Sequence, residues 1–353
     1  MMMHESLTFR CGLSIPNRFI LAPMTNQQSH ANGNLSEEEM HWLTMRAKGG
    51  FGMVMTCASH VSISGQGFPN QMGIFNGVDG HLHTTLNEQI HGYGAASVVQ
   101  IYHGGLRSPS NLIGHAPLAP SPDEKTGARE LTITEVHQVR EDFILAAVRA
   151  QEFGYDGVQI HGAHGYLLAQ FLSPTLNRRT DDYGGSLINR GRLIVEILEG
   201  IRERCGTEFF VSVRLSPERF GMRTREILDF ARWLLALRKV DLLDWSLWDV
   251  HKEHDGVSLL EQVCKQDRHG AWITVAGMIN SSLMVHNLIP QYSDCVSIGR
   301  AAIIHHDFPT RCLDVDFVSN VPPVTKEYLL REGLSEPFVD YMRRWPNFVS
   351  TDQ

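Results

Sequence analysis

The chain has 353 residues, of which 42% are hydrophobic and 20% are charged, and its formal net charge is −8. These values are typical of a globular protein with a large core, and they exclude a basic stripe suited to nucleic acid or an anionic membrane. No apolar run approaches the roughly 20 residues of a membrane span, and residues 1–10 lack the features of a signal peptide. We therefore expect a cytoplasmic protein that binds small molecules, with no nucleic-acid partner and no membrane contact.

Short β-rich runs alternate along the chain with segments of helical period, a pattern typical of parallel strands joined by crossover helices. Several runs are almost wholly apolar, as strands buried on both faces are. Eight such runs predict a single (β/α)8 TIM barrel, with residues 1–353 as one domain. The predicted strands are Arg18–Pro23, Met53–Ala58, Ser97–Tyr102, Gly157–His161, Phe210–Leu215, Leu242–Ser246, Trp272–Ala276 and Cys295–Gly299.

Two of the predicted helices have clear start and stop residues. Ser36 followed by Glu39 has the spacing of a capping box, and Gly49 ends that helix before the second strand. Thr134 is expected to cap the helix that precedes the fourth strand, and Gly154 is expected to end it. Apolar residues recur in this segment at spacings of three and four, which predicts a helix that packs one face on the barrel.

Two connections are too long to be simple turns. Residues 104–133 contain four prolines and predict an extended loop after the third strand, where long loops in barrels are usually functional. Residues 172–186 form a second polar loop after the fourth strand. Residues 321–353 follow the last strand and predict a C-terminal extension that packs on the barrel or on a neighbouring subunit.

Glycine turns follow the seventh and eighth strands, the usual place for a phosphate site in this fold. Gly277 and Gly299 allow backbone N–H groups to approach an anion, and Arg300 adds charge and paired donors. Each glycine alone fits a structural turn as well as a phosphate site. Together with Arg300 they favour phosphate.

The fourth strand ends in two histidines and a tyrosine, His161, His164 and Tyr166. The H-x-x-H pair could bind a metal, serve as buried structural histidines, or donate two hydrogen bonds to a substrate oxygen. No carboxylate stands near the pair to complete a metal site, and the six cysteines are scattered. The residues therefore favour the donor role without a metal, and Tyr166 is placed to supply a proton.

Two longer motifs resemble the Old Yellow Enzyme family. They are HGAHGYLLAQFLSP at residues 161–174 and NRRTDDYGGSLINR at residues 177–190, and the segments at 17–25, 99–103 and 296–300 follow in the family's order. The histidine pair is most similar to that of the shorter bacterial members. The resemblance implies noncovalent FMN, NADPH or NADH as reductant, and reduction of α,β-unsaturated carbonyl or nitro compounds.

The resemblance also implies roles for individual residues. His161 and His164 would bind the substrate oxygen, and Tyr166 would protonate the carbon α to it. The chain departs from the family after Thr25, because Asn26 and Gln27 lie where close relatives often carry a tyrosine that lines the substrate pocket. Gln27 is expected to line that pocket here. The cofactor-binding residues it implies are Pro23, Met24, Thr25, Cys57, Gln100, Arg214, Gly277, Gly299 and Arg300.

The C-terminal extension places two arginines beside aromatic residues. By similarity to histidine-paired relatives, Arg344, or else Arg343, would reach the substrate pocket of a neighbour in a homodimer or homotetramer. Two other functions stay open from the sequence: a metal-dependent barrel hydrolase or lyase that uses His161 and His164, and a flavin-binding protein without catalysis.

Overall fold

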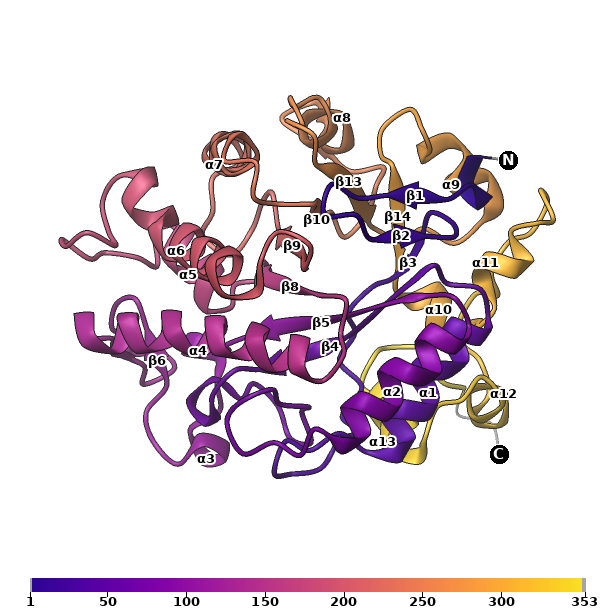
Figure 1. The fold of residues 1–353 in the computed structure, drawn as a ribbon, viewed down its shortest axis with the longest axis horizontal. Coiled ribbons are helices and arrows are strands. Elements are labelled where there is room, and N and C mark those ends of the chain that lie inside the picture. Colours follow the sequence, from indigo (N-terminus) through magenta and orange to yellow (C-terminus); the bar gives the residue numbers. More distant parts are fainter. Residues whose placement is uncertain (1, 351–353) are drawn as a thin grey trace.

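The computed structural model describes residues 2–350 and contains a closed barrel of eight parallel strands (Figure 1). The strands follow one another around the barrel in the order of the chain, so the predicted (β/α)8 barrel is confirmed. Each predicted strand overlaps one observed strand. The barrel strands are β3 (Phe19–Leu21), β4 (Met53–His60), β5 (Ala96–Tyr102), β8 (Gly157–Gly162), β9 (Phe210–Leu215), β10 (Leu242–Ser246), β13 (Trp272–Ala276) and β14 (Cys295–Ile298).

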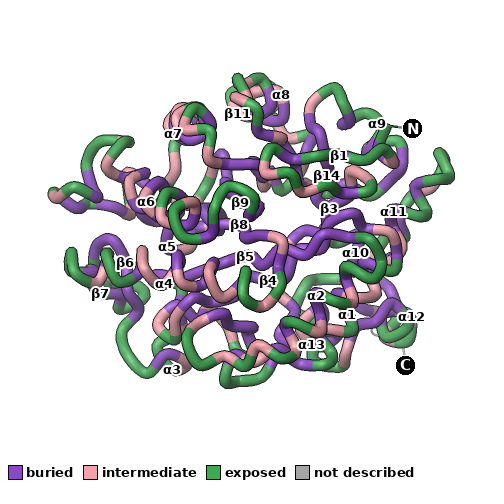
Figure 2. Tube along the Cα trace, viewed as in Figure 1, coloured by how far each residue is buried: buried purple, intermediate pink, exposed green. Residues whose placement is uncertain are grey.

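The barrel strands are buried on both faces, as their apolar sequences predict. Every residue of β4, β5, β8 and β9 is buried, and Figure 2 shows the strands as the buried centre of the molecule. Helices cover the outside of the barrel. The helices between and after the strands are α1 (Glu37–Lys48), α2 (His81–Gly92), α4 (Ile133–Glu152), α5 (Leu167–Leu172), α6 (Leu187–Cys205), α7 (Thr224–Ala236), α8 (Leu259–Cys264), α9 (Ser282–Leu288) and α10 (Arg300–Ile304).

The starts of α1 and α4 differ in detail from the sequence prediction. Ser36 caps α1 by accepting a hydrogen bond from the backbone N–H of Glu39, but the Glu39 side chain turns inward instead of completing a capping box. The cap of α4 is Thr132, not Thr134. Thr132 forms a full capping box with Glu135, a spacing that Thr134 does not have.

A short hairpin closes the barrel at the amino ends of its strands. It consists of β1 (Leu7–Thr8) and β2 (Ser14–Ile15), which pair antiparallel. Leu7, Phe9 and Ile15 pack into one buried cluster with residues that begin barrel strands, among them Met53 and Phe210. Because this end is filled with apolar side chains, the polar side chains of the lumen are confined to the other half of the barrel.

The two long connections are joined by Arg179, which is 6% exposed. Its Nη1 donates to the backbone oxygens of Pro120 and Leu131, and its Nε and Nη2 contact the Asp181 carboxylate. The first connection is more ordered than the predicted loop, because four short elements lie within it. They are η3 (Gly105–Arg107), α3 (Ser110–Ile113), β6 (Leu118–Ala119) and β7 (Arg129–Glu130).

The C-terminal extension packs on its own barrel. It contains α12 (Lys326–Arg331) and α13 (Glu336–Met342), and α13 packs on α1 (Figure 1). The Phe338 ring packs edge-on against Trp42 of α1 with 5.4 Å between centroids, and Ser335 donates two hydrogen bonds to Gln28. The remaining elements are η1 (Met2–His4), η2 (Ile63–Gly65), β11 (Glu253–His254), β12 (Val257–Ser258) and α11 (Phe308–Arg311).

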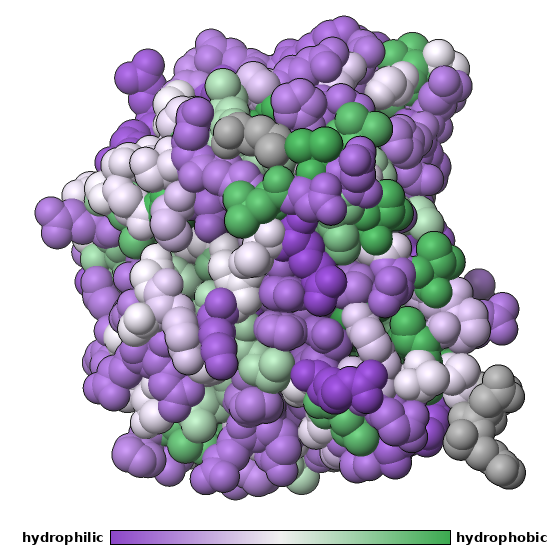
Figure 3. Space-filling view, turned by 90° about the vertical axis from the view of Figure 1, so that its right-hand side faces the viewer, coloured by the Kyte–Doolittle hydropathy of each residue, from purple (hydrophilic) through white to green (hydrophobic). Residues whose placement is uncertain are grey.

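The surface is mainly hydrophilic but includes some exposed apolar side chains, and Figure 3 shows hydrophobic residues gathered in places among polar ones. Leu313, Val315, Val318 and Val321 follow α11 and are all more than half exposed. Within residues 2–350, no helix combines the length and the apolar character required to span a membrane.

The role of Arg179 gives a first prediction. Arg179→Ala removes a buried guanidinium that contacts two carbonyl groups and the carboxylates of Asp181 and Glu130, so we expect a loss of about 2 kcal/mol in the free energy of unfolding. Arg178→Ala is the matched control, because Arg178 is exposed and bonds mainly one carbonyl, that of Pro122. Urea unfolding measures both. Equal losses in the two variants would contradict this role of Arg179.

Candidate active site at the carboxyl ends of the strands

The candidate site begins with His161 and His164, which the end of β8 brings together. Their ring centroids are 5.0 Å apart with the planes tilted by 76°, and His161 Nε2 lies 3.3 Å from His164 Nδ1. His164 has a left-handed backbone (φ 59°), held by a hydrogen bond from its N–H to Ser216 Oγ. This turn directs the second imidazole back toward the first.

Both imidazoles are neutral near pH 7. Burial first, and then the positive charges of Arg214 and Arg107, together lower the pKa of His164 to about 3. The pKa of His161 is also well below its usual value, first through burial and then through His164 and Arg214. A neutral imidazole donates one hydrogen bond and is a poor acid at this pH. The pair can therefore hold an oxygen but not protonate a carbon.

Tyr166 lies beside the pair, as predicted. Its ring centroid is 5.2 Å from that of His161 and 6.4 Å from that of His164. Arg107 supports this arrangement from the loop after β5, because its Cζ lies 4.7 Å from the Tyr166 ring centroid and its Nη1 donates to the His164 carbonyl at 2.7 Å. Tyr166 is only partly buried, so its hydroxyl remains available to a bound molecule.

A ladder of polar side chains crosses the lumen below the histidines. Gln100 Nε2 donates to Gln159 Oε1 at 2.6 Å, and Gln159 Nε2 donates to Asp244 Oδ2 at 3.0 Å. Arg214 Nη1 lies 3.3 Å from the same Asp244 oxygen. Burial raises the pKa of Asp244, although Arg214 and Gln159 oppose the shift. Gln159 and Asp244 were not predicted from the sequence. Each is a polar residue inside an otherwise apolar strand, and this feature of the sequence could have indicated them.

Arg214 has hydrogen-bonding capacity that the described residues do not use. Its side chain is 5% exposed, and its Nε and Nη1 lack hydrogen-bond partners, although Nη1 is within ion-pair distance of Asp244. Buried donors of this kind normally have an acceptor. The oxygen- and nitrogen-rich edge of a flavin ring would supply one, so the residues at this end of the barrel fit FMN.

The three residues predicted to bind phosphate are not equally well placed to do so. A Cβ at Gly277 would lie 2.9 Å from the Val250 backbone N, so packing alone explains this glycine. Gly299 has more room, because an added Cβ would meet only Met24 Sδ at 3.6 Å. Arg300 is exposed, and its Cζ lies 5.4 Å from the Trp248 ring centroid. Gly299 and Arg300 are therefore the better placed to receive a phosphate.

The segment after β3 brings Pro23, Met24 and Thr25 to the same end of the barrel. Cys57 on β4 is placed differently. Its side chain packs in the hydrophobic cluster that includes Trp42 and Leu43 of α1, and its thiol contacts Glu39 of the same helix. Burial and the Glu39 charge raise the pKa of this thiol. A cofactor contact at Cys57 would therefore come from its main chain.

Gln27 lies in a segment that is held from two sides. Its own backbone is left-handed (φ 56°), and it is 9% exposed. On one side, Asn26 Nδ2 donates to the buried Glu39 carboxylate, which also accepts from Ser29. On the other, Gln28 accepts from Ser335 of the C-terminal extension. The predicted pocket residue thus depends on α1 and on the extension for its position.

The C-terminal extension also reaches the site within one chain. Burial raises the pKa of Tyr341, and the side chains that act on its phenol include Tyr166 and Thr25. Tyr341 was not predicted from the sequence to belong to the site. Arg343 pairs with Asp340, whereas the exposed Arg344 lies with its Cζ 5.9 Å from the Tyr341 ring centroid.

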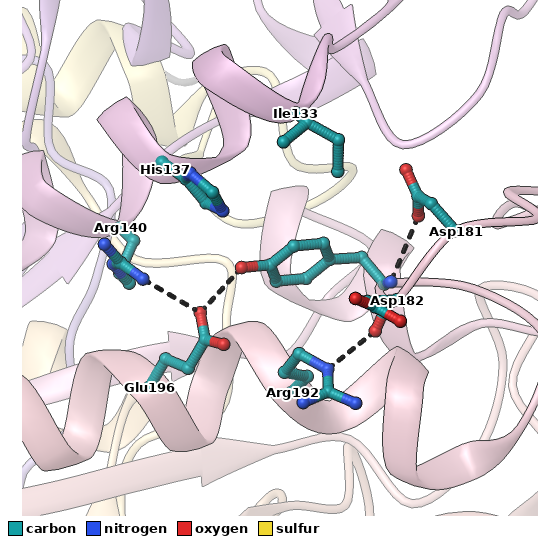
Figure 4. Close-up of a pocket in the computed structure, with 8 residues that line it drawn as sticks. Ile133, His137, Arg140, Asp181, Asp182, Arg192 and Glu196 are labelled. Carbon is teal, nitrogen blue, oxygen red and sulfur yellow. Dashed lines mark hydrogen bonds and ion pairs between the residues drawn. The ribbon is translucent and has the colours of Figure 1, made fainter.

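A polar surface pocket lies away from these strand ends, between α4 and α6 (Figure 4). It contains part of the second sequence motif, including Tyr183 and Asp182. Several of its polar groups already bond within the chain: Glu196 accepts from Arg140 and from the Tyr183 hydroxyl, and Arg192 donates to the Asp182 backbone carbonyl. This motif therefore stabilises the loop and does not form the candidate site.

The side chains that could together bind a metal ion also lie away from the histidine pair. In the described part of the chain, the only three side chains close enough to share an ion are His306, Asp307 and Glu332. That group does not include His161 or His164. The metal-dependent hydrolase or lyase therefore has no complete ligand set at the histidine pair.

Comparison with known proteins assigns the class. Residues 6–314 match the model of the NADH:flavin oxidoreductase / NADH oxidase family. A probable NADH-dependent flavin oxidoreductase of Bacillus subtilis is 37% identical over 70% of this chain and 69% of its own length. An NADPH dehydrogenase of Bacillus pumilus is 32% identical over 84% of this chain and 90% of its own. The Old Yellow Enzyme homologue of Zymomonas mobilis shares the fold, with a TM-score of 0.82, 24% identity, and coverage of 97% and 99% of the two chains.

The fold and the family match together define a barrel oxidoreductase that uses a flavin. The chain belongs to the NADH:flavin oxidoreductase / NADH oxidase family, and its resemblance to the Old Yellow Enzyme family is confirmed. It is an enzyme with FMN as cofactor and NAD(P)H as reductant. A flavin-binding protein without catalysis is thereby set aside.

Arg300 provides the prediction for this site. If it binds the FMN phosphate, Arg300→Ala should raise the Kd for FMN about tenfold or more, since a hydrogen bond to a charged group contributes about 1.5–3 kcal/mol. Arg219→Ala is the matched control, because Arg219 Cζ lies 5.8 Å from the centroid of the same Trp248 ring. Fluorescence titration of the apoprotein with FMN measures both. An unchanged Kd in Arg300→Ala would exclude the phosphate role.

Proposed function

We propose that this enzyme reduces electron-poor C=C bonds of α,β-unsaturated carbonyl or nitro compounds, with His161 and His164 binding the substrate oxygen and Tyr166 supplying a proton. The observation that carries the proposal is the convergence of two neutral imidazoles and a tyrosine at the end of β8. It agrees with membership of a flavin oxidoreductase family, because FMN held at these strand ends would supply the hydride that NAD(P)H provides.

The histidine pair has the properties that this reaction requires of an oxygen-binding site. Hydride addition at the β carbon builds negative charge on the carbonyl or nitro oxygen. Donors fixed in advance stabilise that charge more in the transition state than in the ground state. Their fixed position is supported by the backbone contact of His164 with Ser216 and by the bond from Arg107 to the His164 carbonyl.

Tyr166 supplies what the imidazoles lack. Because the low pKa values of His161 and His164 leave both rings neutral, neither is a good source of a proton at pH 7. The Tyr166 hydroxyl is a donor beside the pair, and its partial exposure allows solvent to replace the proton. This proton would go to the carbon α to the activating group.

Cofactor contacts follow from the same placement. We propose that Arg214 and Gln100 bind the polar edge of the flavin, that Pro23, Met24, Thr25 and the main chain at Cys57 border its ring, and that Gly277, Gly299 and Arg300 surround its phosphate. The unused donors of Arg214 support the first contact most directly. Gln27 would line the substrate pocket from the segment after β3.

The principal test replaces the histidines one at a time. His161→Ala and His164→Ala should each slow oxidation of the reduced enzyme by 2-cyclohexenone roughly a hundredfold, the usual effect of losing one fixed oxyanion donor. Bound flavin should still be reduced by NADPH. Anaerobic stopped-flow measurement separates the two half-reactions. A wild-type enzyme whose reduced flavin transfers no hydride to enones or nitroolefins would refute the proposal.

Tyr166→Phe tests the proton donor within the same assay. The substitution should slow oxidation of the reduced enzyme by 2-cyclohexenone more than oxidation by a quinone. Quinone oxygens can take protons from solvent, whereas the enone needs a proton at carbon. Tyr102→Phe is the control, since Tyr102 packs 4.6 Å from the Tyr166 ring centroid but is itself buried. Equal slowing of both acceptors in Tyr166→Phe would remove Tyr166 from this role.

We also propose that the enzyme is a homodimer or homotetramer in which Arg344 contacts a neighbour's substrate pocket. Arg344 is favoured over Arg343 because Arg343 is engaged by Asp340. Arg344→Ala should raise KM for 2-cyclohexenone while FMN content is unchanged, and Arg343→Ala should have a smaller effect. Sedimentation at micromolar concentration gives the oligomeric state. A fully active monomer would overturn the shared site.

A further inference from the structure

We propose that a basic pocket at the rim of the barrel binds the 2′-phosphate of NADPH, so that the enzyme prefers NADPH to NADH. The pocket lies between the start of α7 and the β11–β12 hairpin, in the loops that follow β9 and β10. Its volume is about 560 Å³, within the usual range for a pocket that binds a small molecule. Three arginines line it: Arg219, Arg223 and Arg225.

The two carboxylates at this pocket do not neutralise its arginines. Glu218 contacts Lys252 Nζ, and its other oxygen lies 3.7 Å from His254 Nδ1. Asp255 is 91% exposed and lies 3.6 Å from His254 Nε2. Because both acids are directed to Lys252 and His254, the arginines keep their positive charge for a ligand.

Two of the three arginines are free to bind an anion. Arg223 lies 3.7 Å from Glu226, which also accepts from Arg190. Among residues 2–350, no carboxylate lies within ion-pair distance of Arg219 or Arg225. A guanidinium binds phosphate oxygens through paired N–H donors. A phosphate monoester carries roughly two negative charges near pH 7, so it matches two unpaired guanidiniums better than either phosphate of a pyrophosphate does.

Phe220 connects this pocket to the histidine pair. Its ring centroid lies 6.4 Å from that of His164, and a Cβ at Gly165 would lie only 2.8 Å from its ring, so Phe220 packs closely over the turn after β8. On the other side, Arg219 Cζ lies 5.7 Å from the Phe220 ring centroid. A molecule that extends outward from the histidines past Phe220 therefore reaches Arg219.

The backbone holds Arg219 at the rim in a conformation that side chains rarely adopt. Arg219 and Phe220 are both left-handed (φ 68° and 52°), and so is Trp248 (φ 68°) on the facing loop. Such backbone is costly outside glycine and clusters at ligand-binding sites. Trp248 is 54% exposed, and Arg219 Cζ lies 5.8 Å from its ring centroid. This cation–π contact keeps the guanidinium beside the pocket.

The architecture places the outer part of the reductant over these loops. Residues 2–350 form one barrel with three small two-stranded sheets, and within them no second parallel sheet is present to hold a dinucleotide. The nicotinamide must reach the flavin at the strand ends, so the adenosine end extends across the rim. NADPH differs from NADH only by the phosphate on that adenosine, and a basic pocket there discriminates between them.

The test measures the reductive half-reaction. Anaerobic stopped-flow reduction of the FMN-loaded enzyme at varied NADPH or NADH concentration gives a Kd for each reductant. We expect the wild type to bind NADPH at least tenfold more tightly. Arg219→Ala and Arg225→Ala should each raise the Kd for NADPH about tenfold, the effect of losing a hydrogen bond to a charged group, and change that for NADH less than twofold.

Arg232→Ala is the matched control, because Arg232 is an exposed arginine of the same helix that pairs with Asp229 outside the pocket. It should leave both Kd values unchanged. Adenosine 2′-phosphate should compete with NADPH for the wild type, and adenosine 5′-phosphate should not.

Equal Kd values for NADPH and NADH in the wild type overturn the inference. Equal increases for both reductants in Arg219→Ala and Arg225→Ala also overturn it, since they would indicate a general effect on the loop. The inference requires a flavin and a nicotinamide reductant but not the proposed function. Because neither measurement uses an enone, failure to reduce enones would refute the proposed function alone.

Discussion

Burial of every barrel strand on both faces is the constraint on which the rest of this structure depends. Apolar side chains fill the amino half of the lumen, where the β1–β2 hairpin adds Leu7, Phe9 and Ile15. Polar side chains can then enter the lumen only near the carboxyl ends, and each must find a partner there. The ladder from Gln100 through Gln159 to Asp244 satisfies this condition, and it ends at Arg214, where donors remain unused.

Much of this arrangement was predictable because it follows from local periodicity and from one topological rule. Apolar runs and turn residues located all eight strands, and the rule that strand ends converge brought His161, Tyr166, Arg214 and Arg300 to one side. The cap of α4 was misplaced by two residues, although the spacing of Thr132 and Glu135 contained the correct signal.

Other features could not be predicted because they depend on side-chain contacts between distant segments. Tyr341 approaches Tyr166 only because α13 packs on α1, a contact between residues about 300 positions apart. The inward orientation of Glu39 and the outward orientation of Cys57 depend on the local register of α1 and β4. The second motif likewise resembled a functional segment in sequence, whereas its contacts hold two loops together through Arg179.

Arg214 connects the two halves of the proposed chemistry. Its guanidinium lies between the Asp244 carboxylate, the Ser246 hydroxyl and the edge where a flavin fits. Negative charge on a reduced flavin would draw the guanidinium toward that edge and away from Ser246, whose 3.4 Å contact is the longest of the set. Asp244 opposes this movement, because it keeps the guanidinium anchored from the other side. The buried carboxylate thus holds Arg214 at the edge where the flavin fits.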